Sequence, residues 1–287
     1  MNSKNSNQLF SSKEAWGFIL PALLGTTIFI LLPIIFSFGL SFFEWDLLSN
    51  PQFVGLKNYQ SIFSEPNYLK ILLNTFVYVA AISSFGAILP LILAYIIARK
   101  FIPAEEFKLI TFLPYITPMV VIATVWAWIF EPSGGLINNI LRTDLKWLYD
   151  ENLAMPVLIF ISVWKLLGYN TLIYLTGFAN INSAIFEAAE LDGAKNSTIL
   201  WKIVTPLLTP TIIFVIIATI ISSFQVFDLI YMMTEGGPNG ATDVIVYSVY
   251  KEGFEYFNAG KSCALGYLLF FIVLICSLLI PKQNKPY

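Results

Sequence analysis

Long apolar runs dominate the pattern of hydrophobic and polar positions along this 287-residue chain. A helix crosses the ~30 Å hydrocarbon core of a bilayer with about 20 apolar residues. Six segments pass this test, and they cover residues 16–43, 71–98, 107–130, 153–178, 207–233 and 264–280. Their residues do not alternate with period two, as the strands of a membrane barrel do. The pattern therefore predicts an all-α integral membrane protein with six transmembrane helices.

The expected spans contain several prolines and are joined by short loops. The prolines are Pro90, Pro114, Pro118, Pro156 and Pro210. A helix bundle tolerates them where neighbouring helices satisfy the carbonyl groups that a proline leaves free. No loop exceeds about thirty residues, which leaves no room for a separate soluble domain. We therefore expect one membrane domain over residues 16–281, with terminal tails over residues 1–15 and 282–287.

Composition narrows the function classes. The chain is 57% hydrophobic and 12% charged, which is more apolar than one soluble core of this length requires. A net charge of -2 leaves no basic surface for nucleic acid. The absence of His excludes histidine-based zinc sites and His-dependent catalytic triads. The first apolar run is long enough to span, so we expect it to be retained rather than cleaved as a signal peptide.

Cys263 and Cys276 are the two cysteines of the chain. If both lie on the last helix, their separation along it is roughly 20 Å. That exceeds the ~7 Å limit on the Cα separation of a disulfide. We expect both thiols to be unpaired.

The distribution of Lys and Arg predicts the orientation in the membrane. Basic residues concentrate in the cytoplasmic loops of membrane proteins. On the side of the two termini lie nine: Lys4, Lys13, Arg99, Lys100, Lys108, Lys195, Lys202, Lys282 and Lys285. On the other side lie six: Lys57, Lys70, Arg142, Lys146, Lys251 and Lys261. The count places both termini in the cytoplasm, although Arg142 and Lys146 lie in a loop assigned to the outside.

The cytoplasmic loop between the fourth and fifth spans, residues 183–206, contains a predicted short helix. Ser183 can cap its first turn, and the alanine-rich centre has high helix propensity. Gly193 can supply the positive φ at which such a helix ends. A helix of this kind lies flat on a membrane surface or docks into a groove of a partner.

At these residues the chain resembles the permease subunits of binding-protein-dependent ABC importers. The hallmark of that family is the cytoplasmic EAA loop, which matches Glu187, Ala188, Ala189, Asp192, Gly193, Ala194, Ile203 and Pro206. The resemblance implies type I importer architecture in a bacterial cell membrane. It also implies that the loop is a coupling helix on one of two ATP-binding subunits, with a second permease and an extracytoplasmic solute-binding protein as the other partners.

The resemblance narrows to the sugar-importing branch, whose type member is the maltose permease pair. The similar segments are 53–59, 163–170 with Trp164, Lys165 and Asn170, and 224–228 followed by Gly236, Gly237 and Pro238. The chain departs from the pattern at Ser183, where the family often has Pro, and at Thr205, where Leu is commoner. Sugar as the substrate rests on this resemblance alone.

Polar residues in the spans flanking this loop are candidates for the substrate path. Ser162, Lys165 and Tyr169 share one helix face, as do Thr219, Ser223 and Val226. Hydroxyl, amide and aromatic groups bind sugars, so Asn170 and Gln225 are further candidates. The same small polar residues also permit close helix packing.

Two charges belong to these spans. A charge at the midplane costs at least ~2.5 to 3.5 kcal/mol, so Lys165 faces a polar cavity or a partner. Asp228 lies near the outer end of the fifth span, roughly 10 Å away in depth. The two are therefore not expected to form a direct pair.

Residues 259–262, which read Ala-Gly-Lys-Ser, imitate the end of a phosphate-binding loop. That motif requires Gly at the position that Glu255 occupies, and the segment lies on the predicted outer side. We therefore expect no cofactor in this chain, with ATP and Mg held by the partner ATPase.

Three alternatives remain open. The first is an ABC permease for a polyol, glycerol phosphate or an oligopeptide. The second is a proton- or sodium-coupled carrier, which predicts inverted repeats and several intramembrane acids; no such repeat is visible, and Asp228 is the one candidate acid. The third is a membrane enzyme, but no cluster of nucleophile, base and orienting residue is visible in the sequence.

Overall fold

Helices make up nearly all of the regular structure in the computed structural model, which describes residues 12–99 and 104–279. Two-residue strands β1 (Phe43–Glu44) and β2 (Gln52–Phe53) form a small antiparallel hairpin. The α-helices are α1 (Ser12–Thr26), α2 (Leu32–Leu40), α3 (Lys57–Ser64), α4 (Pro66–Ala98), α5 (Ala104–Ile116), α6 (Met119–Ile129), α7 (Leu136–Leu141), α8 (Ala154–Phe178), α9 (Ser183–Leu191), α10 (Asn196–Thr198), α11 (Thr205–Leu207), α12 (Thr209–Phe224), α13 (Asp228–Met233), α14 (Ile245–Tyr250) and α15 (Ala259–Leu279). Wider π-helical turns are η1 (Thr27–Leu31), η2 (Ile199–Val204) and η3 (Lys251–Glu255).

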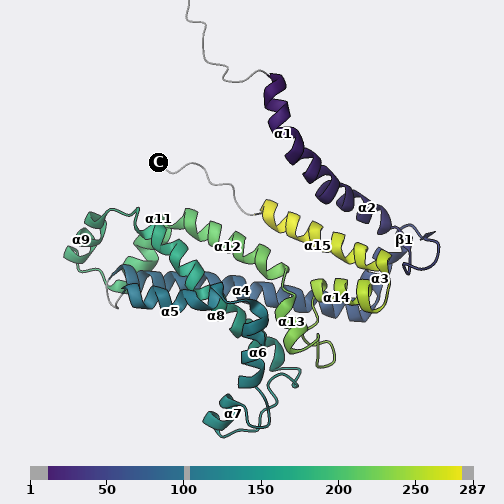
Figure 1. Cartoon of the computed structure of the whole chain (residues 1–287). Helices are drawn as coiled ribbons and strands as arrows, with labels where there is room; N and C mark the ends of the chain where they lie inside the picture. The colour runs from purple at the N-terminus through teal and green to yellow at the C-terminus, as the bar shows by residue number, and fades with distance from the viewer. Residues whose placement is uncertain (1–11, 100–103, 280–287) are drawn as a thin grey trace, which may run out of the picture.

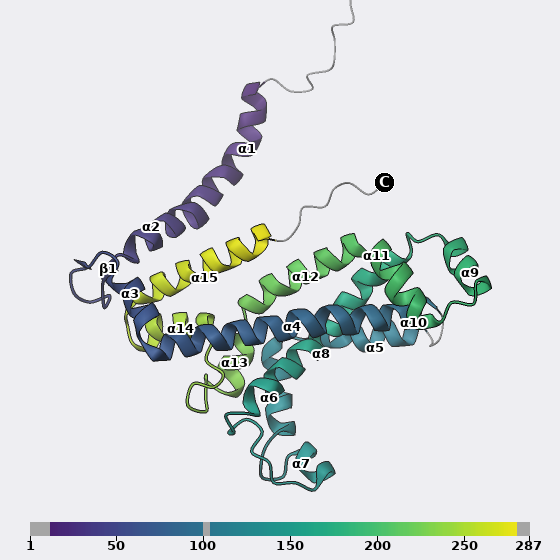
Figure 2. The same ribbon diagram turned by 180° about the vertical axis from the view of Figure 1, so that it is seen from behind.

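The helices α4, α5, α8, α12 and α15 pack side by side and form the body of the molecule (Figure 1). α4 packs along α8 and α12, α5 packs along α8, and α15 packs against α12. The helix α9 lies at one end of this body, whereas β1 and α14 lie at the opposite end. In the view from behind, α6 and α7 turn away from the body of the molecule (Figure 2).

Single helices long and apolar enough to cross a membrane cover Trp16–Leu40, Pro66–Ala98, Ala154–Phe178 and Ala259–Leu279. They match the first, second, fourth and sixth predicted spans within a few residues. The number of candidate spans among the described residues rises to six if each of two bent helix pairs is counted as one span. With the bent pairs counted in this way, the predicted fold of six transmembrane helices is confirmed.

The third and fifth spans differ from the prediction of one continuous helix each. Helices Leu109–Ile116 and Met119–Ile129 meet at 106°. Pro118 lies in the break, and it has no backbone N–H with which to continue the helix. The fifth span pairs Asn196–Leu207 with Thr209–Phe224 at 79°. It ends at Phe224, so the predicted continuation to residue 233 is wrong.

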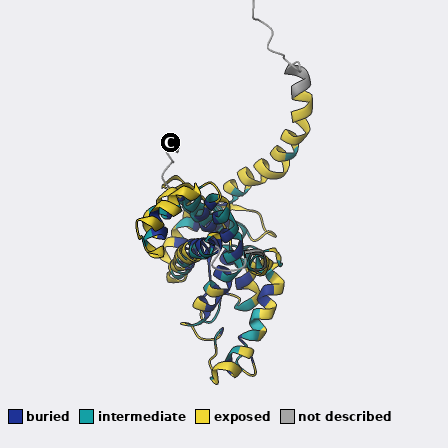
Figure 3. Ribbon diagram, turned by 90° about the vertical axis from the view of Figure 1, so that its left-hand side faces the viewer, coloured by how far each residue is buried: buried dark blue, intermediate teal, exposed yellow. Residues whose placement is uncertain are grey.

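The first span projects away from the body (Figures 1 and 3). Its most apolar stretch has no buried residue, and Phe29 is 78% exposed. The span touches the body where α2 meets α15. An apolar surface of this size is stable only against lipid or another protein. Residues 1–11 and 280–287 lie outside the described residues, as does most of both predicted tails.

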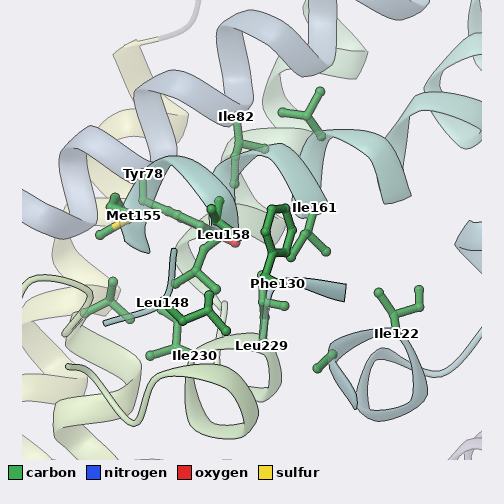
Figure 4. Close-up of a cluster of buried hydrophobic side chains, with 14 of the residues drawn as sticks. Tyr78, Ile82, Ile122, Phe130, Leu148, Met155, Leu158, Ile161, Leu229 and Ile230 are labelled. Carbon is green, nitrogen blue, oxygen red and sulfur yellow. The ribbon is translucent and has the colours of Figure 1, made fainter. Parts of the chain in front are cut away.

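Buried side chains gather in three clusters. The largest joins α4, α6, α8 and α13, through residues that include Tyr78, Ile122, Leu158 and Leu229 (Figure 4). A second cluster lies beside α9 and joins it to α4, α8 and η2. A third joins α3, α4, α14 and α15. The second cluster is the one that fixes the predicted coupling helix to the spans.

Two glycines on α8 allow close approach of neighbouring helices. A Cβ at Gly168 on α8 would lie 2.0 Å from the Thr111 carbonyl oxygen on α5. A Cβ at Gly177 would lie 2.8 Å from Thr211 Oγ1 on α12. Small residues at helix contacts are typical of membrane bundles. The two glycines let α8 pack tightly between α5 and α12.

Candidate functional site

The predicted short helix at residues 183–193 is present as α9. Its N-terminal cap is Asn182, whose Oδ1 accepts a hydrogen bond from the Ala184 N–H at 3.0 Å. The prediction that Ser183 is the cap is wrong by one residue, because Ser183 already has helical geometry. Asn is as good a cap as Ser, so Asn182 caps the helix and Ser183 is its first residue.

The C-terminal end of α9 closes through Gly193, which has φ +72 as predicted. The Ala194 N–H donates to the Ala189 carbonyl at 2.9 Å, and the Gly193 N–H donates to the Glu190 carbonyl at 3.0 Å. This pair of bonds is the Schellman arrangement, which needs a left-handed residue at the position of Gly193. Gly193 therefore terminates α9 and turns the chain toward α10.

One face of α9 is packed and the other is open. Ala189 is buried in the second cluster, and Phe186 packs against that cluster. The exposed face carries Ala184, Glu187, Ala188 and Leu191, spaced by three and four residues on one side of the helix. We call these four residues the exposed stripe. Leu191 is 89% exposed, which is an unusual environment for a leucine in a defined helix.

Arg99, the C-terminal cap of α4, ties α9 to α4. Its guanidinium forms an ion pair with Glu190 and lies 5.4 Å from the centroid of the Phe186 ring. Tyr95 OH donates to Asn196 Oδ1 at 3.3 Å, so the segment after α9 is also held by α4. Pro206 is exposed in α11, between η2 and α12. The loop is thus fastened to the end of α4 on both sides of Gly193.

A small cavity of 130 Å³ lies among α4, α6, α8 and α12, and most of its surface is apolar. We call it the polar chamber after the serine and lysine residues in its lining. Its lining includes three residues predicted for the substrate path, namely Ser162, Lys165 and Ser223. The remaining residues of the lining are Tyr78, Ile82, Met119, Leu166, Ser222 and Val226. Residues more than 140 positions apart in the sequence meet here.

Four of the residues that line the polar chamber carry hydroxyl groups, namely Tyr78, Ser162, Ser222 and Ser223. Tyr78 OH and Ser162 Oγ share a hydrogen bond of 2.7 Å. Ser222 Oγ donates to the Thr219 carbonyl at 3.0 Å. Ser223 Oγ is buried without a hydrogen-bond partner, and a buried hydroxyl in that state costs free energy until something binds it. Ser223 thus lines the polar chamber, but its Oγ is buried and has no hydrogen-bond partner.

Lys165 borders the polar chamber, but its ammonium group is engaged elsewhere. Its Nζ donates to the carbonyl oxygens of Pro114 at 3.1 Å, Tyr115 at 3.2 Å and Thr117 at 2.6 Å. An ammonium group has three protons, so these three bonds occupy all of them. Lys165 thus has the polar surroundings that its place in a span requires.

Three further candidates make helix contacts. Asn170 Nδ2 donates to the Gly86 carbonyl at 2.7 Å and to Thr219 Oγ1 at 3.2 Å. The Tyr169 ring stacks on Tyr115 with centroids 4.2 Å apart. These bonds join α8 to α4, α12 and α5. Asn170, Thr219 and Tyr169 hold the walls together instead of facing the polar chamber.

Gln225 and Asp228 do not join the other candidates. α12 ends at Phe224, Gln225 caps it, and Asp228 begins α13. Both side chains are exposed. The helical spacing that grouped Val226 with Thr219 and Ser223 does not apply beyond Phe224, although Val226 still lines the polar chamber. The prediction of a continuous helix misplaced these residues.

Residues 259–262 serve the packing of α15. A Cβ at Gly260 would lie 1.7 Å from the Phe43 carbonyl oxygen. Lys261 forms an ion pair with Glu65 at 3.2 Å, and Ser262 Oγ donates to the Val249 carbonyl at 2.8 Å. Each residue that imitates a phosphate-binding loop has a structural partner.

Comparison with known proteins agrees with this architecture. Residues 86–281 match the family model described as binding-protein-dependent transport system inner membrane component. The sn-glycerol-3-phosphate transport system permease protein UgpA of Agrobacterium fabrum is 35% identical over 228 residues, which are 77% of each chain. The probable ABC transporter permease protein YurN of Bacillus subtilis is 32% identical over 280 residues, 93% of this chain and 94% of that protein.

The fold is also similar to a solved structure. A chain of a bacterial alginate ABC transporter, crystallised with an alginate pentasaccharide-bound periplasmic protein, superposes with a TM-score of 0.81 at 22% identity. The match covers 93% of this chain and 92% of that chain.

Proposed function

Because the chain belongs to the binding-protein-dependent transport system inner membrane component family, and is therefore a permease subunit and not an enzyme, we propose that it serves an ATP-driven importer of a sugar or oligosaccharide. The family makes it a multi-pass membrane protein of a system that uses a binding protein. In this proposal a second permease completes the path, and two ATP-binding subunits supply the energy. Both chain termini and α9 lie on the cytoplasmic side.

The exposed stripe of α9 is the observation that carries the proposal. It presents one large apolar side chain, Leu191, beside the carboxylate of Glu187 at the end of the body. A helix with an open stripe of this kind docks into a groove of a partner. Because α9 is already fastened to α4 through Arg99, force applied to the stripe reaches the spans. ATP and Mg are bound by the partner that supplies the groove.

The position of α9 in the chain supports a coupling mechanism. α8 leads directly into α9, and α10, η2 and α11 lead from α9 into α12. α8 and α12 both line the polar chamber. When ATP closes the two ATP-binding subunits, the paired α9 helices move together and the chamber walls change their arrangement. ATP acts by stabilising one of two arrangements of the spans.

The polar chamber supports a carbohydrate as the substrate. Its wall combines an apolar surface with four hydroxyl-bearing residues, which can bind a sugar ring once the spans rearrange and their present contacts open. Among the described residues that line it, Lys165 carries the only charge, and that charge is engaged with three carbonyls. A volume of 130 Å³ holds about four waters at ~30 Å³ each. The second permease therefore has to complete a path wide enough for a sugar.

Glycerol 3-phosphate is the second candidate, favoured by the 35% identity to a protein named for its transport. A phosphate group binds to free Arg or Lys side chains, whereas the lining of the polar chamber contributes none. Uptake of radiolabelled sugars and of glycerol 3-phosphate in a strain lacking this chain separates the two. We expect the deletion to abolish uptake of a neutral sugar or oligosaccharide and to spare glycerol 3-phosphate.

Docking of α9 is tested by placing a charge in the exposed stripe. We expect Leu191→Glu to abolish co-purification of the ATP-binding subunit in mild detergent, because a carboxylate does not enter an apolar groove. Leu48→Glu is the matched control, since Leu48 is 93% exposed in the loop between β1 and β2. Equal recovery of the ATP-binding subunit with both variants would remove the coupling role from α9.

A further inference from the structure

The bend between α5 and α6 leaves carbonyl groups without helical partners. The carbonyl of Pro114 would accept from the backbone N–H of residue 118, but Pro118 has none. Thr117 lies in the two-residue break itself. Within a bilayer no water is available to satisfy such groups. The bend of 106° therefore needs a donor from another element.

Lys165 on α8 is that donor. Its Nζ lies 3.1, 3.2 and 2.6 Å from the carbonyl oxygens of Pro114, Tyr115 and Thr117. These groups form the C-terminal end of α5, where the helix dipole is negative and a cation is favoured. The partners match in number as well as in charge, because an ammonium group has three protons.

The surrounding contacts align α8 with the same end of α5. Gly168 follows Lys165 by three residues, and it admits the Thr111 carbonyl, which would lie 2.0 Å from a Cβ. Tyr169 follows by four residues and stacks on Tyr115 at 4.2 Å with an interplanar angle of 7°. Residues at this spacing share one helix face. α8 thus grips the last two turns of α5.

We propose that Lys165 is a positioning residue that fixes the bend between α5 and α6 and thereby shapes the polar chamber. Met119, the first residue of α6, lines that chamber together with Lys165. Release of the three carbonyls frees α6 to swing about residues 117 and 118, and Met119 then leaves the chamber wall. Lys165 acts on the substrate through this wall and not through contact. The role of the bend in transport rests on the proposed function. The bend itself is a feature of the structure and does not depend on that proposal.

The angle is measurable as a distance between spin labels. Leu109 on α5 and Trp128 on α6 are 73% and 63% exposed, so each accepts a label after Cys263→Ser and Cys276→Ser. At 1.5 Å per residue, Leu109 and Trp128 lie roughly 12 and 15 Å along their helices from the break. A bend of 106° between the two helices then places the backbones of these two residues about 16 Å apart. A straight helix places them about 28 Å apart.

We compare wild type, Lys165→Arg and Lys165→Met in the assembled transporter. The expected result is a short distance for the wild type and Lys165→Arg, and a shift toward the long distance for Lys165→Met with a raised apparent KM of uptake. ATP hydrolysis is expected to continue, because the hydrogen bonds of Lys165 go to the end of α5 and the break after it, and not to α9. Where Lys165→Met is not recovered from membranes, Lys165→Gln replaces it, since Gln keeps two donors without the charge.

Two outcomes would overturn the positioning role. A short distance in Lys165→Met with lost uptake would show that the ammonium acts on the substrate directly. A short distance with normal uptake would show that Tyr169 and Gly168 hold the bend alone. The distance is read without transport, so a failure of the importer proposal and a failure of this one are distinguishable.

Discussion

Substitution of Gly193 isolates the geometry that ends α9. Gly193 has φ +72, and a Cβ built on it meets nothing within 4 Å. Gly193→Ala therefore causes no steric clash, and its cost is that of holding an L-residue in the left-handed region, about 1–2 kcal/mol. At 1.4 kcal/mol per tenfold, the equilibrium for closing this helix end falls by roughly 5- to 30-fold.

The consequence is read as uptake per ATP hydrolysed. In proteoliposomes containing the partner subunits and the binding protein, we expect Gly193→Ala to lower this ratio while assembly persists. Gly193→Asn is the matched variant, because Asn tolerates the left-handed conformation, and it should retain most of the coupling. Gly266→Ala on α15 also meets nothing within 4 Å and has no positive φ, so it should leave the ratio unchanged.

The ranking of these variants decides the argument. If the left-handed turn is what matters, uptake per ATP hydrolysed should be highest in the wild type, lower in Gly193→Asn and lowest in Gly193→Ala. The reasoning is refuted if Gly193→Ala couples as well as the wild type, or if Gly193→Asn fails as completely as Gly193→Ala. In the second case the space beside Gly193, and not its φ, would be the requirement.

Three further substitutions test the contacts around the site. The double variant Arg99→Glu/Glu190→Arg should recover part of the uptake that each single variant loses, because it restores the ion pair with the charges exchanged. This partly exposed pair contributes about 0.2–1 kcal/mol. Equal losses of uptake in all three variants would speak against the pair. Asn170→Leu removes two buried hydrogen bonds and should destabilise the detergent-solubilised complex by about 1–3 kcal/mol, seen as a lower melting temperature. Gly260→Ala forces a Cβ to 1.7 Å from the Phe43 carbonyl and should cost about 1–3 kcal/mol in the same assay, with unchanged melting counting against that contact.

The straight spans could be predicted from the sequence because length and apolar content alone define them. The prediction for α4 began at residue 71 and that for α8 at residue 153, against Pro66 and Ala154 in the structure. The bends could not be predicted in the same way. Pro90 lies inside α4 without interrupting it, whereas Pro118 lies in a break of 106°. The difference depends on Lys165, which is distant in sequence and reaches the freed carbonyls from another helix.

The helix α9 was predicted from its local sequence pattern, but the contacts that hold it against α4 were not. Arg99 entered the sequence argument only as a charge that reports orientation. Its pairing with Glu190 and Phe186 depends on how α4 and α9 meet in space. A usable signal was the pair of cations, Arg99 and Lys100, that ends the second predicted span on the same side as the acidic residues of α9. Leu191 was also overlooked, although it follows Glu187 by one helical turn.

The grouping of the candidate substrate-path residues was predicted in part. Ser162, Lys165 and Ser223 meet at the polar chamber because α8 and α12 are regular helices there. Gln225 and Asp228 were assigned to the same helix, but α12 ends at Phe224. A helix end inside an apolar run has no strong local signal. Residues beyond such an end are therefore misplaced by periodicity.

The most direct test of the account asks what the exposed stripe of α9 touches. In a chain with Cys263→Ser and Cys276→Ser, Ala188→Cys places one thiol on that stripe, and Leu48→Cys places a control thiol between β1 and β2. We predict that the thiol at position 188 is protected from a membrane-impermeant maleimide in intact cells and cross-links to the ATP-binding subunit. The control thiol should be labelled from outside. Labelling of position 188 from outside, with no cross-link to that subunit, would contradict the account.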